Sequence, residues 1–312
     1  MKCAYCGKEA KGTREHIISC AILDLFPECY ITFDGARNTA HESDPMVKDV
    51  CAECNNTKIS YIDSYAKEFI SKYFTQKYKE DDVVEVKYDY VMVQKMLLKY
   101  AFNDMRSHKE DCSFFDQEII HYLLNVEDNI PKENVTVLCG LAVNVSPVPD
   151  AMFGNLKLRW CKNPILYNNS TIRHINYETG QIYLNDDVEK EEFPDLKVSY
   201  AFRFNSVQFL LLCWEKSSDK IEQNNVVLEC QYPYCLLKAK EDKATLPVCT
   251  DESNYHHFEH IHVRWDRLFE VGLMRKYASG GRFKYKEQYE KEWVEEEKKL
   301  VNNIQGKSSS LE

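Results

Sequence analysis

The sequence lacks any run of about eighteen apolar residues, so it predicts no membrane-spanning helix, and we expect no membrane partner. It begins Met-Lys-Cys without an apolar leader, and we therefore expect no secretory signal and a cytoplasmic location. No internal repeat is visible. The 312 residues are 44% hydrophobic and 12% aromatic, which is enough for a real core and for two domains.

Positive charge is also scarce. The chain has 40 Lys and Arg against 50 Asp and Glu, which gives a net charge of −10. Residues 1–80 hold 11 basic and 12 acidic side chains, so they carry about −1 and the rest of the chain about −9. Binding to nucleic acid draws on Lys and Arg, so strong non-specific binding is not expected. Capture of a nucleic acid would then depend on a homo-oligomer, a partner protein or a trigger.

Cysteine, by contrast, is plentiful. The chain has 13, and an odd number without a leader is typical of reduced thiols rather than a disulfide framework. Four of them form two Cys-x-x-Cys pairs, Cys3/Cys6 and Cys51/Cys54, with 44 residues between Cys6 and Cys51. Each pair is typical of a zinc knuckle, in which a tight turn points two thiolates at one metal ion. Two knuckles complete a four-sulfur tetrahedron, so we predict a structural Zn²⁺ site.

The segment between the knuckles carries residues with a chemical use. Glu15 and His16 precede two β-branched residues, and Asn55 directly follows the last cysteine of the second pair. A histidine at the end of a strand can act as general base on a water molecule. The carboxylate of Glu15 and the amide oxygen of Asn55 can hold a hard divalent ion such as Mg²⁺. Such an ion would polarise a phosphodiester and stabilise the departing oxyanion.

Together these residues resemble the HNH endonucleases, the ββα-metal nucleases, in their zinc-braced form. That family has two zinc knuckles, an Asp/Glu-His-Ile-Ile/Val segment between them, and a His or Asn directly after the final cysteine. The residues that match are Cys3, Cys6, Glu15, His16, Ile17, Ile18, Cys51, Cys54 and Asn55. The resemblance covers about residues 1–75. It implies a metal-dependent endonuclease that hydrolyses phosphodiester bonds, usually in DNA, as bacterial restriction and anti-phage enzymes do.

The chain departs from the family at the middle Asn, which normally lies several residues before the third cysteine. The nearest one, Asn38, precedes Cys51 by thirteen residues. In the family this residue fixes the loop and orients the histidine; residues that could substitute are Asp44, Asp49 and His41. Asn56 could replace Asn55. The missing Asn also leaves a second hypothesis open, a catalytically inactive zinc-stabilised module that binds nucleic acid or protein.

Hydrophobic periodicity predicts an α+β protein in two parts. We expect an HNH module over residues 1–80, with a first strand at His16–Ile18 and a helix after the second knuckle. An α+β domain with a mostly antiparallel sheet is expected over 81–304, and a disordered tail over 305–312. The predicted helices of the second domain are Val91–Met105, Phe115–Leu124 and Phe283–Val301. The predicted strands are Val135–Val145, Leu156–Trp160, Ile172–Tyr177, Gln181–Leu184, Val198–Phe204, Val207–Trp214 and Val226–Tyr232.

Overall fold

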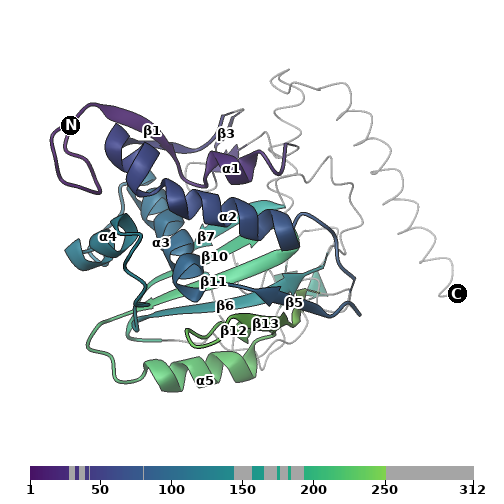
Figure 1. Cartoon of the computed structure of the whole chain (residues 1–312). Coiled ribbons are helices and arrows are strands. Elements are labelled where there is room, and N and C mark those ends of the chain that lie inside the picture. The colour runs from purple at the N-terminus through teal and green to yellow at the C-terminus, as the bar shows by residue number, and fades with distance from the viewer. Residues whose placement is uncertain are drawn as a thin grey trace, which may run out of the picture.

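In the computed structural model, helices pack on a mostly antiparallel sheet, which is the α+β class that the sequence predicts (Figure 1). The structure describes residues 1–27, 32–34, 39–41, 43–79, 81–143, 157–164, 174–175, 182–183 and 193–250. The predicted features outside these ranges are Asn38, the predicted helix at 283–301 and the tail at 305–312. Within these ranges no helix is long and apolar enough to span a membrane.

The N-terminal part consists of two antiparallel strands followed by a helix. Strand β1 (Gly12–His16) pairs with β4 (Met46–Cys51) so that Gly12 lies opposite Cys51 and His16 opposite Met46. The chain leaves β4 through a short π-helical turn, η1 (Cys54–Lys58), and continues directly into helix α2 (Ser60–Tyr73). The segment between β1 and β4 contains α1 (Cys20–Leu23), β2 (Thr32–Asp34) and β3 (Thr39–His41), of which β2 and β3 pair with each other.

The first strand begins earlier than predicted. We expected it at His16–Ile18, whereas β1 ends at His16, and Ile17 and Ile18 follow it as buried residues. The N–H of Ile17 still donates to the carbonyl oxygen of Pro45 at 2.9 Å. The prediction was wrong because the polar residues of β1 show no apolar alternation, so the strand is defined by its pairing with β4 rather than by its own sequence.

Three helices form where local sequence signals predict them. The stripe of α2 that faces the core consists of Ile62, Ala66, Phe69 and Ile70, and Ile59 just before the helix is also buried. Helix α3 (Tyr90–Ser107) starts at Asp89, whose carboxylate accepts the N–H of Met92 at 3.1 Å. Helix α4 (Gln117–Leu124) starts at Asp116, which accepts two backbone N–H groups at 3.0 Å. Such caps satisfy amides that the first turn leaves without partners.

The central sheet has the strand order β12-β6-β11-β10-β7, all antiparallel, and β14 joins β6 in parallel. Its strands are β6 (Val135–Ala142), β7 (Leu158–Lys162), β10 (Leu196–Phe204), β11 (Val207–Trp214), β12 (Cys235–Leu236) and β14 (Val248–Thr250). Strands β5 (Val84–Lys87) and β13 (Lys243–Leu246) form a separate pair, as do β8 (His174–Ile175) and β9 (Ile182–Tyr183). Every residue of β6 and β11 is buried, which fits their apolar sequences.

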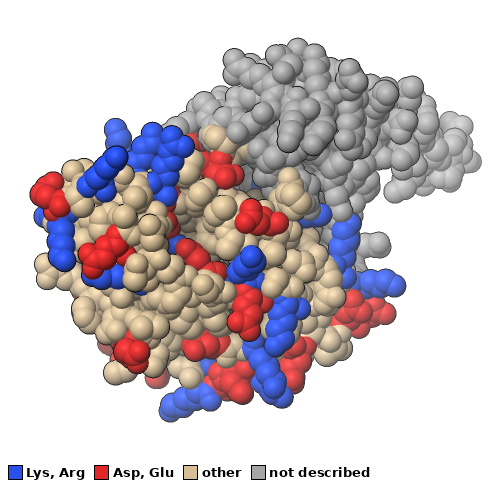
Figure 2. Space-filling model, turned by 45° about the horizontal axis from the view of Figure 1, so that its top comes forward, with Lys and Arg blue, Asp and Glu red and all other residues tan. Residues whose placement is uncertain are grey.

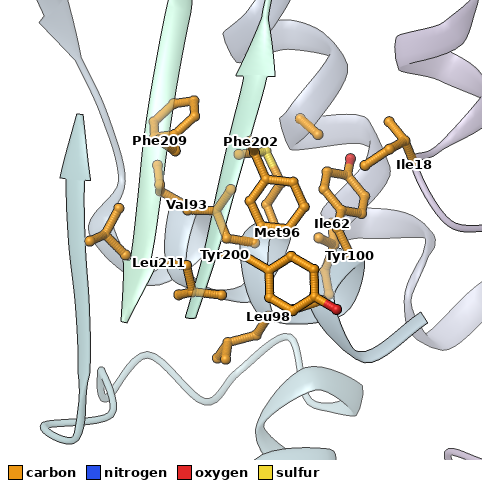
Figure 3. Packing of buried hydrophobic residues seen from close by; sticks show 14 of the residues in the cluster. Ile18, Ile62, Val93, Met96, Leu98, Tyr100, Tyr200, Phe202, Phe209 and Leu211 are labelled. Atoms are coloured by element: carbon orange, nitrogen blue, oxygen red, sulfur yellow. The ribbon is translucent and has the colours of Figure 1, made fainter. Parts of the chain in front are cut away.

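Both faces of this sheet are covered. Helices α2 and α3 lie on one face and α5 (Ile221–Gln231) lies on the other (Figure 1). On the first face, Val93 and Met96 of α3 pack against Phe202 and Phe209 of the sheet (Figure 3). These residues belong to one continuous apolar cluster, whose members come from positions between Cys3 and Leu246. Side chains on both sides of residue 80 therefore share one core, and a domain boundary at that position stays a prediction.

The predicted strand at Val226–Tyr232 is wrong, because this segment belongs to helix α5. Its apolar run Val226-Val227-Leu228 is too short to distinguish a strand from one side of a helix. In the structure only Leu228 is fully buried, against the second face of the sheet, while Val226 is 60% exposed. Glu222, Gln223 and Glu229 are exposed on the outer side of the helix, whereas Asn225 accepts a hydrogen bond from the hydroxyl of Thr136 in β6 at 2.7 Å.

Candidate metal centre and adjoining site

The four cysteines of the two pairs meet in space. The Sγ atoms of Cys3, Cys6, Cys51 and Cys54 all lie within 4.8 Å of one another, and those of Cys6 and Cys51 are 3.8 Å apart. A tetrahedral zinc ion with Zn–S bonds of about 2.3 Å requires sulfur atoms roughly 3.8 Å apart. The donor set and its spacing therefore fit a structural metal site of the zinc type.

The backbone explains why these thiols converge. In the first knuckle the N–H of Gly7 donates to the carbonyl oxygen of Cys3 at 2.9 Å, and Gly7 has a φ of +70°, which a residue with a Cβ rarely adopts. In the second knuckle, Cys51 ends β4 and Cys54 begins η1. A Cβ on Gly12 would collide with the carbonyl oxygen of Lys48, so glycine allows the close approach of β1 to β4 beside the cluster.

The surroundings of the thiols favour at least one thiolate. Burial raises the pKa of the Cys3 thiol, but the backbone N–H groups of Cys51, Cys6 and Tyr5 outweigh it and lower the pKa to about 7. Burial and the neighbouring thiols raise the pKa of Cys54. Without a cation, deprotonation of further thiols in this cluster is therefore unfavourable. A divalent cation at their centre would reverse that preference by stabilising the thiolates.

His16 lies at the end of β1, beside Asp44. Its Nε2 atom is 3.4 Å from Oδ2 of Asp44, and its side chain is 24% exposed. Asp44 belongs to the segment just before β4 and is itself exposed. A carboxylate beside one ring nitrogen favours a proton on that nitrogen and leaves the other one as the basic atom.

Glu15 lies in a different environment. It is 4% exposed, and its Oε1 atom is 2.8 Å from the Nζ atom of Lys99, which is fully buried in α3. Lys99 also contacts Asp63 of α2 at 2.5 Å. The sequence led us to expect that Glu15 would hold a divalent ion together with Asn55, but its carboxylate neutralises a buried ammonium group. Adjacent residues of a strand point to opposite faces, which separates the surroundings of Glu15 from those of His16.

Asn55 connects the start of the helical segment to the strand that carries His16. Its Nδ2 atom donates to Oγ1 of Thr13 at 2.9 Å and to the carbonyl oxygen of Arg14 at 3.0 Å. Both hydrogens of the amide are therefore used within β1. Its Oδ1 atom is left as the acceptor, which is also the atom that could bind a hard cation.

Comparisons with protein-family models, with curated proteins and with solved structures find no match to this chain. Its function must therefore be inferred from the geometry of its own residues.

The remaining predicted site residues differ in whether they contact His16. Asp49 accepts a hydrogen bond from Arg106 of α3 at 3.2 Å, and Asn56 is exposed in η1. His41 belongs to β3, but its side chain is outside the described part of the structure, as is the whole of Asn38. Among the described residues that could replace the family's middle Asn, Asp44 is therefore the one in contact with His16.

Sequence reasoning missed a polar face of α3 that contacts the N-terminal strands. Lys99, Asn103 and Arg106 follow one another at helical spacing and contact, respectively, Glu15, His16 and Asp49. The sequence signal was present, since these polar residues recur at a spacing of three to four among the apolar residues of the helix. Asn103 is fully buried although it lies near the end of the helix.

A second buried polar cluster lies near the end of the same helix. Asp104 accepts hydrogen bonds from Nε1 of Trp160 and from the hydroxyl of Tyr200, both at 2.8 Å. Burial raises the pKa of Asp104, while these two donors and the nearby His108 act to lower it. Because Trp160 and Tyr200 come from β7 and β10, this cluster fastens α3 to the central sheet.

Proposed function

We propose that this chain is a metal-dependent endonuclease of the HNH type, which hydrolyses phosphodiester bonds in nucleic acid, with DNA as the expected substrate. One observation carries the proposal: the amide of Asn55, at the start of the helical segment, hydrogen-bonds to the strand that ends in His16. The imidazole of His16, the amide of Asn55 and the cluster of four thiols thus belong to one strand–strand–helix unit. This arrangement is what the family resemblance implies.

His16 is the proposed general base. With Asp44 beside Nε2, the proton stays on that nitrogen and Nδ1 accepts a proton from water. The oxygen of that water forms a bond to phosphorus while the bond from phosphorus to the departing ester oxygen breaks. Asp44 thus fixes the ring and balances the positive charge that forms on it.

A divalent ion such as Mg²⁺, when bound, would stabilise the negative charge on the departing oxygen. Asn55 provides an amide oxygen for it, and Mg²⁺ commonly completes its shell with water and with phosphate oxygens of the substrate. Glu15 could bind the ion only if its carboxylate gave up its ion pair with the ammonium group of Lys99. We therefore assign the ion to Asn55 and the substrate rather than to Glu15.

The charge distribution is compatible with a nucleic-acid substrate near these strands. Exposed basic side chains in or next to the first knuckle, β1 and β4 include Lys2, Lys8, Lys11, Arg14 and Lys48. Figure 2 shows Lys and Arg side chains gathered at the upper left and interspersed with Asp and Glu elsewhere on that face. Basic side chains position phosphates without reading sequence, so they would orient a backbone over the site without giving high affinity.

A second candidate function is a zinc-stabilised binding module without catalysis. The observation that favours it is the ion pair between Glu15 and Lys99. This ion pair occupies the carboxylate that the family pattern implies as a ligand of the divalent ion.

Cleavage of supercoiled plasmid with Mg²⁺ or Mn²⁺ tests the proposal. The native chain is compared with His16→Ala and Asn55→Ala, and with His121→Ala as the matched control, since His121 is exposed on α4. Loss of one catalytic acid–base group typically lowers the rate by about 10²–10⁴-fold. We expect the first two variants to lose cleavage and the control to keep it.

Equal cleavage by the native chain and His16→Ala would contradict the proposed role of His16. No cleavage of DNA or RNA by the native chain, with either metal, would favour the binding module.

A further inference from the structure

Asn103 of α3 is the most completely bonded polar side chain next to the site. It is fully buried, and its Nδ2 atom donates to the carbonyl oxygen of His16 at 3.0 Å and to Oε1 of Glu15 at 3.3 Å. Its Oδ1 atom accepts from the hydroxyl of Tyr5 at 2.9 Å and from Nη2 of Arg106 at 2.6 Å. The amide therefore uses both hydrogens and both lone pairs.

These four bonds join three parts of the molecule. Tyr5 lies between the cysteines of the first knuckle, His16 ends β1, and Arg106 reaches Asp49 of β4. Arg106 also lies over the Tyr5 ring, with its Cζ atom 5.2 Å from the ring centroid. Asn103 is thus the point at which helix α3 contacts the knuckle and the strand that carries the imidazole.

The contact with His16 differs in kind from the others, because it is made to the main chain. At the end of β1 the carbonyl oxygen of His16 is held by a side chain from another element. The direction of a residue's Cβ is fixed by its flanking peptide planes, so a bond to this carbonyl sets the direction in which the imidazole leaves the strand.

We infer that Asn103 is a positioning residue for His16, so that helix α3, which lies outside residues 1–80, completes the proposed nuclease site. This inference rests on the proposed function. Asn103 itself touches neither water nor substrate, and it acts only by holding the His16 peptide. A displacement of about 1 Å in a reacting group can cost about 100-fold in rate, so a single hydrogen bond to that peptide can matter.

The test compares Asn103→Asp with Tyr5→Phe in the full-length, zinc-loaded chain. Asp has the shape of Asn but cannot donate to the His16 carbonyl oxygen. Tyr5→Phe is the matched control, because it removes one buried hydrogen bond to the same Asn103 and leaves the bond to His16 intact. Asn103→Ser is the second variant, because it adds no charge beside Glu15 and is too short to reach His16.

We expect both Asn103 variants to lower kcat for plasmid cleavage by about 10–100-fold with KM within about twofold, while Tyr5→Phe keeps kcat within about threefold. Zinc content should equal that of the native chain in all three. Equal losses of kcat in the Tyr5 and Asn103 variants would overturn the inference, as would unchanged kcat in Asn103→Asp. Failure of both Asn103 variants to fold would also overturn it, since the residue would then serve stability alone.

Hydrogen exchange separates this inference from the proposed function. The N–H of Ile17, which donates to the carbonyl oxygen of Pro45, belongs to the same peptide group as the His16 carbonyl oxygen that Asn103 holds. We expect exchange in the peptide covering residues 14–18 to be at least about tenfold faster in Asn103→Asp than in Tyr5→Phe. If the native chain is inactive but the two variants still differ in exchange, the proposed nuclease function is rejected, and the inference that Asn103 positions the His16 peptide is supported. Equal exchange in the two variants would reject the positional role whatever the activity.

Discussion

Glu15 and His16 are neighbours in sequence but have opposite surroundings, and the reason lies far away in the chain. Lys99 is fully buried and has two negative partners, the buried Glu15 at 2.8 Å and the less buried Asp63 at 2.5 Å. The sequence shows Glu15 next to His16, as in the family pattern, but a partner 84 residues away leaves no local signal. The convergence of the four thiols and the position of Asn55 against the strand that carries His16 could be predicted from the sequence, whereas the ion pair of Glu15 with Lys99 could not.

Replacing Lys99 by Met leaves Glu15 buried without its ammonium partner. We expect a loss of about 3–5 kcal/mol in the free energy of unfolding, because breaking one side of a buried ion pair leaves an uncompensated charge. Lys95 is the matched control: it is also fully buried in α3, but its Nζ atom contacts the carbonyl oxygen of Asn125. Lys95→Met should cost about 1–2 kcal/mol. Urea unfolding of the zinc-loaded proteins measures both, and equal losses would refute the assigned role of Lys99.

Asp104 makes stability depend on pH in a defined direction. Burial raises the pKa of Asp104 in the folded protein, so its contribution is fully present below its unfolded pKa, about 3.9, and is lost as pH rises through the raised folded value. The hydroxyl of Tyr200 stabilises the carboxylate. Tyr200→Phe raises the folded pKa further, so we expect it to cost about 2 kcal/mol at pH 8 and less at pH 5, because a lower pH favours the protonated carboxyl over the carboxylate that the hydroxyl stabilises.

The control for this pH dependence is Tyr122→Phe. Tyr122 is fully buried, and its hydroxyl donates to the neutral amide of Gln94 at 2.8 Å. The loss in the free energy of unfolding caused by Tyr122→Phe should be nearly the same at pH 5 and at pH 8. Any acid-induced loss of metal affects both variants alike, so a pH-independent loss in Tyr200→Phe would show that Asp104 does not titrate as inferred.

At the scale of elements, the hairpin of β1 and β4 has little core of its own and depends on the thiol cluster and on α3. Strands β6, β10 and β11 could be predicted from their runs of β-branched, aromatic and other apolar residues, and helices α2, α3 and α4 from apolar residues at helical spacing. The strand β1 and helix α5 could not, since β1 is polar throughout and α5 contains only one fully buried apolar residue. Pairing and packing determine both.

Cys51→Ser tests the dependence of the hairpin on the cluster. Cys51 ends β4 and faces three other thiols, so its loss should lower bound zinc to well below one ion per chain and reduce the free energy of unfolding by several kcal/mol. Cys213→Ser is the control, because Cys213 is buried in β11 without a role in the cluster. It should keep the full zinc content. Equal zinc loss in both variants, measured by elemental analysis, would contradict the assignment.

At the scale of the whole molecule, the N-terminal strands and the sheet share one apolar core, and α3 contributes to both. Its Lys99, Asn103 and Arg106 contact the N-terminal strands, whereas Asp104 contacts the sheet. A segment comprising residues 1–80 alone would leave Glu15 and Asp49 without these partners. We expect it to bind zinc but to give poorly dispersed amide NMR signals, unlike the full chain. A well-dispersed spectrum would establish an independent domain.

The central claim is that four sulfur atoms hold one metal ion that fixes the two N-terminal strands. Zinc-edge X-ray absorption on the full-length chain tests it most directly. We predict about one zinc ion per chain with four sulfur ligands at about 2.3 Å and no nitrogen or oxygen in the first shell. A shell containing nitrogen or oxygen, or the absence of bound zinc, would contradict it.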